Sequence, residues 1–375
     1  MWRTDIAHPG PSVIAVRAGQ AYDITHHAAT TADLFDAPDA VVIAQHATGE
    51  HLGSAQALLD LALSKSETKH RLLAPCDVQA IKACGVTFAV SLLERVIEQQ
   101  AAGDARKADA LRAQMLASLG SDLSLIVPGS AGAARLKADL IARGLWSPYM
   151  EVGIGPDAEV FTKSQPMSAV GYGADVGILA DSHWNNPEPE VVLAVNSRAQ
   201  IVGATLGNDV NLRDIEGRSA LLLGKAKDNN ASCAIGSFIR LFDANFTLDT
   251  VRAAELSLSI EGEGEGDGDG FELSGTSRMA EISRDPADLV RQTMGAHHQY
   301  PDGLMLFLGT MFSPIKDRGT AGAGFTHHLG DRVTIASSAL GALVNHVQLS
   351  HTLPPWAFGV RGLYANLAQR GFIKP

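Results

Sequence analysis

The chain has 375 residues, of which 46% are hydrophobic and 19% are charged, a composition typical of folded proteins rather than disordered ones. At about 150 residues per domain, the length predicts two to three domains. The formal net charge of −11 argues against nucleic acid or an anionic membrane surface as a partner. A small anionic substrate is still compatible with this charge, because one local cluster of cations or a metal ion can hold it.

Three features of the sequence narrow the class of protein further. The three cysteines form no C-x-x-C motif, so neither a disulfide framework nor a zinc knuckle is expected. No apolar run approaches the ~18 residues that can span a bilayer, and the first five residues carry no apolar leader. We therefore expect a cytoplasmic enzyme or binding protein without membrane contact.

Short strands and turns are predicted for residues 1–75. Residues 13–17 (VIAVR) precede a turn at 18–20, and the β-branched run at 40–44 (AVVIA) is also typical of a strand. A helix is expected at 54–63. Together these patterns predict a small β-rich N-terminal domain.

Helical periodicity begins after residue 87. Apolar residues at 89, 92, 93, 96 and 97 follow the spacing of one helix face. Two further stripes cover 108–119 and 133–142, and the sequence PGS precedes the second of them. We interpret all three stripes as core packing rather than as ligand-binding faces.

Strands are expected to dominate beyond residue 150, with few helices after residue 250. The segments 190–196 and 200–206 flank a short turn and predict a hairpin. Further strands are expected at 251–261, 304–312 and 332–337. The acidic, glycine-rich tract 261–270 is interpreted as a solvated hairpin loop, because its glycines leave the carboxylates on a flexible chain that cannot preorganise a metal site.

Two carboxylates stand two residues apart where an apolar strand begins. Side chains two apart on a strand point the same way, so Glu188 and Glu190 are directed at one point. Placed together, two carboxylates repel each other unless a cation lies between them. Asp209 follows the hairpin, nineteen residues after Glu190, and can return to the same place as a third oxygen ligand.

Three carboxylates without a His or Cys cluster suit a hard divalent ion, Mg²⁺ or Mn²⁺, better than zinc. The alternative is that Glu188 and Glu190 form a solvated strand face, since Glu-x-Glu pairs are common. The spacing alone leaves both interpretations open.

Several short motifs occur in an order that resembles the fumarylacetoacetate hydrolase superfamily, and within it the dehydratases of 2-keto-3-deoxy sugar acids. The motifs are GVTF at 85–88, the Glu-x-Glu pair, NDV at 208–210 with RD at 213–214, Lys227 followed by SCAIG at 232–236, LGT at 308–310 and GDRV at 330–333. Each motif is weak alone, whereas the ordered set is specific and covers most of the chain.

The resemblance implies an α+β fold, mainly β, in which a β-roll-like catalytic domain at 76–375 follows the small N-terminal domain at 1–75. It also implies a homodimer or homotetramer. It assigns Mg²⁺ binding, or Mn²⁺ binding, to Glu188, Glu190 and Asp209.

The catalytic pair of the dehydratase branch maps onto Glu159 and Lys227. Glu159 lies in a strand-like segment, 155–163, that ends in lysine, and the distance to the segment 232–236 selects Lys227 rather than Lys225. Candidate substrate contacts are Ser91, Lys163, Arg213, Gly309 and Thr310. Arg213 is equally suited to holding a neighbouring carboxylate.

One departure from the superfamily pattern bears on the reaction. Hydrolytic members carry a histidine where this chain has Ser91, and a serine without a partner is no base near neutral pH. The sequence therefore favours dehydration over hydrolysis of a C–C bond.

The reaction that the resemblance implies is the Mg²⁺-dependent dehydration of a 2-keto-3-deoxypentonate, of the D or L series, to 2,5-dioxopentanoate in non-phosphorylative pentose catabolism. In this hypothesis Lys227 takes a proton from C3 and Glu159 protonates the leaving C4 hydroxyl, or the two roles are exchanged. The alternatives are hydrolysis of an acylpyruvate or 2,4-diketo acid, a metal-free Schiff-base lyase using Lys227, and a sugar-acid-binding protein without catalysis.

Overall fold

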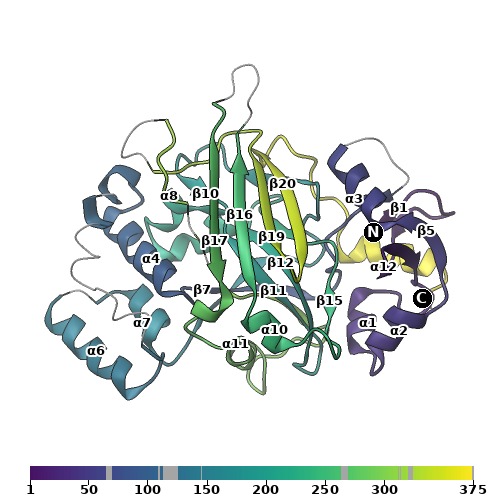
Figure 1. Cartoon of the computed structure of the whole chain (residues 1–375), viewed down its shortest axis with the longest axis horizontal. Helices are drawn as coiled ribbons and strands as arrows, with labels where there is room; N and C mark the ends of the chain where they lie inside the picture. Colours follow the sequence, from purple (N-terminus) through teal and green to yellow (C-terminus); the bar gives the residue numbers. More distant parts are fainter. Residues whose placement is uncertain are drawn as a thin grey trace.

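A computed structural model describes residues 1–64, 70–108, 110–112, 126–144, 146–262, 269–310, 312, 314–319 and 324–373. Two large sheets form the centre of this part of the chain, and helices lie around them (Figure 1). The predicted mixed α+β fold, mainly β, is confirmed at this level. The division into domains at residues 75 and 76 remains a prediction.

The first large sheet carries the predicted hairpin at its middle. Within the described residues it has seven strands, ordered β14-β12-β11-β18-β7-β8, and β15 also pairs with β12. The hairpin strands β11 and β12 are antiparallel, and β18 and β7 are parallel. The strands are β7 (Ala80–Gly85), β8 (Glu159–Ser164), β11 (Pro189–Val195), β12 (Ile201–Asp209), β14 (Cys233–Ile235), β15 (Arg240–Leu241) and β18 (Leu304–Phe307).

The second large sheet has the order β17-β16-β19-β20-β9 and, in the described part of the chain, five strands. Pairing of Glu261 with Glu272 makes β16 and β17 the predicted hairpin around the acidic tract, while residues 263–268 of that tract lie outside the described residues. The strands are β9 (Asp175–Ile178), β16 (Glu255–Glu261), β17 (Glu272–Arg278), β19 (Arg332–Ser337) and β20 (Gly341–Leu349). A two-stranded ladder joins β10 (Asn185–Asn186) to β13 (Asn211–Leu212).

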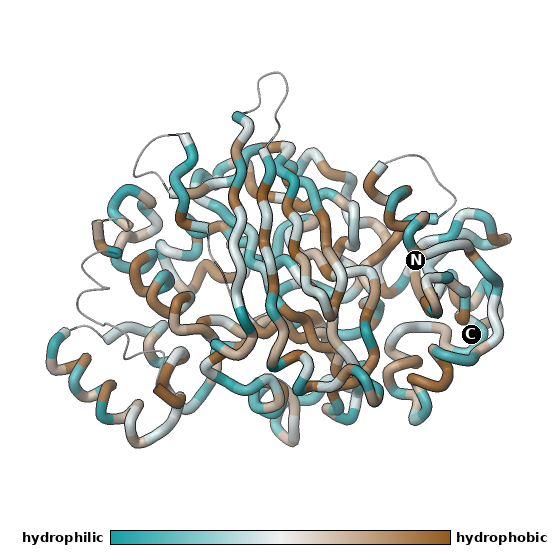
Figure 2. The backbone as a smooth tube through the Cα atoms, in the orientation of Figure 1, coloured by the Kyte–Doolittle hydropathy of each residue, from teal (hydrophilic) through white to brown (hydrophobic). Residues whose placement is uncertain are grey.

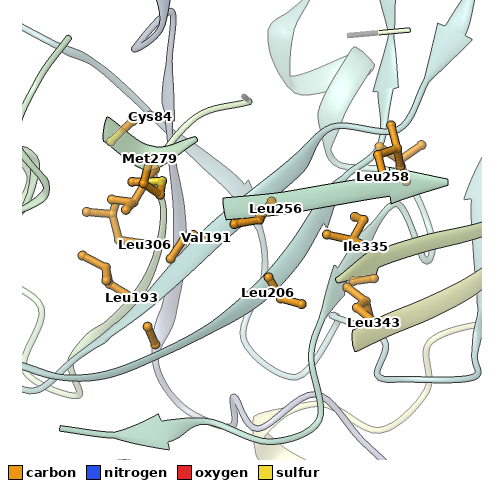
Figure 3. Close-up of a cluster of buried hydrophobic side chains, with 14 of the residues drawn as sticks. Cys84, Val191, Leu193, Leu206, Leu256, Leu258, Met279, Leu306, Ile335 and Leu343 are labelled. Carbon is orange, nitrogen blue, oxygen red and sulfur yellow. The ribbon is translucent and has the colours of Figure 1, made fainter. Parts of the chain in front are cut away.

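The main hydrophobic core lies between the two large sheets. Val191, Leu206 and Leu306 from the first sheet meet Leu256 and Ile335 from the second (Figure 3). Strand β16 alternates exposed and buried positions, the period-2 pattern of a strand with one face on the core. Strand β11 is buried along its whole length, and the hydropathy colouring shows apolar strands at the centre of the molecule (Figure 2). The first sheet is therefore a rigid support for side chains at the ends of β11 and β12.

Two of the predicted helical stripes are confirmed. Helix α4 (Ala89–Ala101) covers the first, and α6 (Ala131–Ala142) covers the third, with the Ser130 hydroxyl accepting from the Ala133 N–H at its start. Most of the stripe at 108–119 lies outside the described residues. Helix α7 (Pro148–Ile154) packs against α4, and the short α8 (Arg213–Glu216), η2 (Ala220–Leu222) and α9 (Leu223–Lys227) follow β13.

The described part of residues 1–75, which leaves out 65–69, contains two small sheets and three helices. The strands β1 (Trp2–Arg3), β2 (Gly10–Pro11) and β6 (His70–Arg71) form one sheet, and β3 (Ile14–Arg17), β4 (Gln20–Asp23) and β5 (Glu50–Ser54) form the other. The helices are α1 (Thr31–Asp36), α2 (Ala40–His46) and α3 (Ala55–Ser64), so the helix predicted at 54–63 is confirmed. In Figure 1 these elements lie together at the right, beside the C-terminal helix α12 (Val360–Gln369).

The strand predicted at 40–44 is wrong, because these residues form helix α2. The Arg17 guanidinium donates to the carbonyl oxygens of Ala44 at 2.7 Å and Ala47 at 2.6 Å, which satisfies acceptors at the end of this helix. Packing against α1 and β3 also favours the helix. Tertiary contacts of this kind override the strand propensity of a short β-branched run.

After residue 250 the described residues contain more strands than helices, as expected, but the individual helices were not predicted. Helix α10 (Leu248–Arg252) takes the first residues of the strand expected at 251–261, since Thr247 and Thr250 form a capping box before it. Helices α11 (Pro286–Thr293) and α12, the turn η3 (Met279–Glu281) and strand β20 were not anticipated. Among the described helices, none has the length and apolar character required to cross a membrane.

Candidate metal centre and active site

The hairpin of β11 and β12 brings the three predicted carboxylates to one end of the first sheet. Antiparallel pairing of Pro189 with Asn208 places Glu188 beside Asp209, whose N–H donates to the Glu188 carbonyl at 3.0 Å. One carboxylate oxygen each from Glu188, Glu190 and Asp209 lies within 4.8 Å of the others, and all three residues are buried. We call these residues the acidic triad. A solvated strand face, the alternative interpretation of Glu188 and Glu190, is incompatible with this burial.

Two buried lysines contact the acidic triad from neighbouring elements. Lys227 ends helix α9, and its Nζ lies 2.5 Å from Glu188 Oε2 and 3.1 Å from Asp209 Oδ2. Lys163 on β8 places its Nζ 3.0 Å from Asp209 Oδ1. Burial by itself lowers the pKa of Lys227, but Asp209 and Glu188 outweigh it, so the pKa is raised above its ordinary value. Lys227 is therefore held as an ammonium in this arrangement.

Glu190 is the member of the triad whose negative charge is least compensated by neighbouring cations. Its Oε2 accepts a hydrogen bond from the Gly309 N–H at 2.7 Å, and within the described residues it has no ion pair. Burial, followed by the charges of Asp209 and Glu188, raises the pKa of Glu190 well above its usual range. An all-oxygen donor set with surplus negative charge fits a hard divalent cation such as Mg²⁺.

Glu159 lies at the start of β8, beside the turn that joins β7 to α4. A Cβ added at Gly85 would lie 2.0 Å from Glu159 Oε2, so the missing side chain makes room for this carboxylate. The next residue, Val86, has φ of 58°, a strained conformation for a β-branched side chain. Burial raises the pKa of Glu159, and Arg95 and Lys227 oppose that rise. Glu159 is therefore close enough to Lys227, its predicted catalytic partner, for the charge of the lysine to act on it.

The LGT motif lies beside this turn. The Thr87 hydroxyl donates to the Leu308 carbonyl at 2.6 Å, and a Cβ at Gly309 would lie 2.0 Å from Thr87 Oγ1. Gly309 has φ of 101°, which favours glycine, and its N–H is committed to Glu190. The Thr310 hydroxyl donates to the Phe312 carbonyl at 3.1 Å. Gly309 therefore holds the triad, while a substrate contact by Thr310 remains a prediction.

Two other candidate contacts have buried partners. The Ser91 hydroxyl donates to the Phe88 carbonyl at 2.8 Å and accepts from the Phe88 N–H at 3.2 Å, so it closes the first turn of α4. Arg213 places Nε 2.6 Å from Glu98 Oε1 and Nη2 2.9 Å from Glu94 Oε2. The second interpretation of Arg213, that it holds neighbouring carboxylates, is the one that the contacts favour.

Arg95 was not anticipated from the sequence. It lies on α4, is buried, and places Nη2 2.7 Å from Glu188 Oε1. Its Nη1 lies 2.7 Å from both Glu98 Oε2 and Glu216 Oε2, and burial raises the pKa of Glu216 to about 7 against the opposing charge of Arg95. The sequence feature that could have indicated Arg95 is the pair of opposite charges at positions 95 and 98, beside the apolar stripe of α4.

Comparisons with known proteins agree with the motifs. No family model matches the chain. The chain is 30% identical over 199 residues to the 2-dehydro-3-deoxy-D-arabinonate dehydratase of Saccharolobus solfataricus, a match covering 51% of this chain and 58% of that protein. It is 31% identical over 199 residues to a probable 2-keto-3-deoxyxylonate dehydratase of Haloferax volcanii, covering 53% of this chain and 63% of that protein. The matches thus span about three fifths of each relative's length.

A solved structure shares the fold. A 2-keto-3-deoxy-D-arabinonate dehydratase complexed with magnesium and 2,5-dioxopentanoate superposes with a TM-score of 0.61 at 18% identity, covering 90% of this chain and 94% of the other. Its apo form gives the same TM-score at 19% identity. The predicted resemblance to 2-keto-3-deoxypentonate dehydratases is confirmed by the two sequence relatives, and the solved structure shows that the fold is shared.

Proposed function

We propose that this chain catalyses the Mg²⁺-dependent dehydration of a 2-keto-3-deoxypentonate to 2,5-dioxopentanoate. The observation that carries the proposal is the buried acidic triad, three oxygen donors on a rigid hairpin with more negative charge than their lysines balance. Two sequence relatives named as pentonate dehydratases, and a neighbour solved with magnesium and 2,5-dioxopentanoate, support this substrate class.

Glu188, Glu190 and Asp209 would hold the metal, which acts as a Lewis acid on the carboxylate and keto oxygens of a 2-keto acid. Mn²⁺ is an alternative ion for the same donors. Gly309 fixes Glu190 through its N–H, and Lys163 fixes Asp209, so the donors are oriented before an ion binds. Removing the ion with EDTA should abolish turnover, and adding Mg²⁺ should restore it. Full turnover by the chelated protein would rule the proposal out.

Glu159 and Lys227 are the proposed acid–base pair. Dehydration removes one proton from C3 and expels the C4 hydroxyl with a proton as water. The C5 hydroxymethyl then loses one C–H proton and its O–H proton, C3 and C4 each take up one proton, and C5 becomes the aldehyde of the product. One member of the pair takes the C3 proton and the other protonates the leaving hydroxyl, each contributing on the order of 10²–10⁴-fold.

Deuterium exchange distinguishes these two roles. We expect Glu159→Gln and Lys227→Met both to lose turnover. The variant that still exchanges the C3 protons of the substrate with D₂O has lost the acid, and the variant that no longer exchanges them has lost the base. If neither variant loses turnover, the pair has been assigned wrongly.

Hydrolysis of an acylpyruvate is the second candidate, and the position of Ser91 argues against it. Its hydroxyl is committed to the first turn of α4 and is no base for water. Both enantiomers of 2-keto-3-deoxypentonate and an acylpyruvate should be incubated with the protein and the products identified. We expect 2,5-dioxopentanoate from one enantiomer; cleavage of the acylpyruvate alone would select the second candidate.

Three further expectations belong to this proposal. The homodimer or homotetramer implied by the resemblance can be tested by light scattering on the purified chain. The cytoplasmic location and the N-terminal domain at 1–75 likewise remain predictions. Limited proteolysis tests the domain, because an independent domain is cut first in its linker to the rest of the chain.

A further inference from the structure

Arg95 connects the acidic triad to a buried ladder of alternating charges. From the triad outward the contacts are Arg95 with Glu98, Glu98 with Arg213, Arg213 with Glu94, and Glu94 with Arg112, at 2.6–2.9 Å. Arg213 also packs its guanidinium over the Trp184 ring, 4.4 Å from the centroid. Arg95 and Arg213 each have more than one carboxylate partner, so their planar groups are fixed in direction.

The two oxygens of Glu188 have different partners. Oε1 lies 2.7 Å from Arg95 Nη2, whereas Oε2 lies 2.5 Å from the Lys227 Nζ that also contacts Asp209. Oε2 is therefore the oxygen that faces the rest of the triad. Glu98 and Glu216 hold the other amino group of Arg95, so the guanidinium cannot turn away from Oε1 without breaking two further buried ion pairs.

We propose that Arg95 is a positioning residue that occupies Glu188 Oε1 and leaves Oε2 alone to bind a divalent ion. Single-oxygen coordination suits the compact octahedral shell of Mg²⁺, whereas Ca²⁺ readily takes both oxygens of a carboxylate and a larger shell. Arg95 therefore sets the preference of the site for Mg²⁺ over Ca²⁺. This inference rests on the proposed metal site and adds the residue that determines its ion selectivity.

The informative measurement is the ratio of the Mg²⁺ affinity to the Ca²⁺ affinity. Loss of a positive charge strengthens the binding of any cation, and this general effect cancels when the Mg²⁺ affinity is divided by the Ca²⁺ affinity. Calorimetric titration of the chelated full chain with each metal alone, without substrate, gives both values. We expect Arg95→Met to lower the ratio at least tenfold, the range typical of residues that orient metal ligands.

Arg213→Met is the matched control, since it removes a positive charge from the same ladder without touching Glu188. Its ratio should match that of the unmodified chain. An unchanged ratio in folded Arg95→Met, or an equal fall in both variants, would overturn the proposal. If the unmodified chain binds neither Mg²⁺ nor Mn²⁺, the proposed function fails and this inference fails with it, a result distinct from unchanged selectivity.

Two further measurements keep the test decisive if Arg95→Met does not fold. The double variant Arg95→Met with Glu216→Gln removes one buried charge of each sign, and it should show the same fall in the ratio. A crystal structure of the unmodified chain with Mn²⁺ should show Glu188 bound through Oε2 alone, with Arg95 still on Oε1. Coordination by both oxygens would contradict the proposal whatever the variants do.

Discussion

Two clusters of buried charge show how similar residues serve different ends. In the acidic triad, Lys163, Lys227 and Arg95 contact Asp209 and Glu188, and Glu190 has no cation of its own among the described residues. In the second cluster, one arginine serves two aspartates. Arg318 lies 2.6 and 2.9 Å from the oxygens of Asp269, and 2.6 and 2.8 Å from those of Asp331. We call Arg318, Asp269, Asp331 and His327 the Arg318 cluster.

The pKa of Glu190 in the triad and the pKa of Asp269 in the Arg318 cluster are shifted in opposite directions, whereas Lys163 and Lys227 lower the pKa of Asp209 despite its burial. Hydrogen bonds from Arg318 lower the pKa of Asp269 to about 2. In the triad, burial and the neighbouring acids raise the pKa of Glu190 well above its usual range. A carboxylate held by a guanidinium fork has its compensation within the fold. A buried carboxylate crowded by like charges is neutralised by a proton or by a cation from outside, and this difference separates a structural ion cluster from a candidate ligand site.

Loss of a triad carboxylate should have the largest functional effect. Glu190→Gln keeps the shape of the side chain and removes the charge that the fold leaves uncompensated. We expect kcat/KM to fall by about 10³-fold, since a Lewis-acid metal contributes several kcal/mol and each 1.36 kcal/mol is tenfold. Calorimetry should show weakened Mg²⁺ binding, while thermal unfolding of the chelated variant should occur no earlier than for the unmodified chain. Retained activity would place the metal elsewhere.

The matched change in the Arg318 cluster should affect stability instead. Asp331→Asn leaves the buried Arg318 with one carboxylate and removes the partner of His327 Nδ1, 3.0 Å away. Breaking a buried ion pair by removing one partner costs about 3–5 kcal/mol. Denaturant unfolding should show this loss, and the Mg²⁺ affinity of the folded variant should be unchanged. An equal loss of Mg²⁺ affinity in Asp331→Asn and Glu190→Gln would remove the distinction between the clusters.

The triad could be predicted from the sequence because its geometry is local. Alternation along β11 directs Glu188 and Glu190 the same way, and a short hairpin returns Asp209 beside them. The roles of Arg95 and Arg318 could not be predicted in this way. Arg95 reaches Glu188 across ninety-three positions of sequence, and the approach of α4 to β11 depends on the packing of the whole core.

The errors in secondary structure have a related cause. The run at 40–44 is β-branched, yet helix α2 forms because Arg17 caps its end from another element. Strand β20 forms a local hairpin with β19, but its other partner in the sheet, β9, lies far away in the sequence. Periodicity reports the local preference of a segment, and these segments are decided by contacts that only the folded chain supplies.

A smaller loss of activity is expected from adding a side chain at Gly85, which lies against Glu159. Gly85→Ala would bring a Cβ to 2.0 Å from Glu159 Oε2, so the carboxylate must move. A displacement of about 1 Å can cost about 10²-fold in turnover. We expect that loss with unchanged Mg²⁺ binding, because Glu159 is not in the triad. Gly224→Ala, where an added Cβ meets no atom within 4 Å beyond its chain neighbours and the backbone of its own helix, should keep full activity. Equal activity in both variants would remove Glu159 from the reaction.

The smallest expected effect is a pH dependence confined to the Arg318 cluster. Because the pKa of Asp269 is lowered from 3.8 to about 2 in the folded chain, its ionised form stabilises the fold above about pH 4. That contribution should be lost as the pH falls from about 4 to about 2. Asp269→Asn should therefore have an unfolding temperature a few degrees below that of the unmodified chain at pH 6, and this difference in unfolding temperature should disappear toward pH 2. Asp302→Asn, at an exposed position, should give no such difference at either pH. If the difference in unfolding temperature for Asp269→Asn stays constant with pH, the side chain acts through its shape rather than its charge. The contrast with the acidic triad would then rest on the geometry of the ion pairs alone.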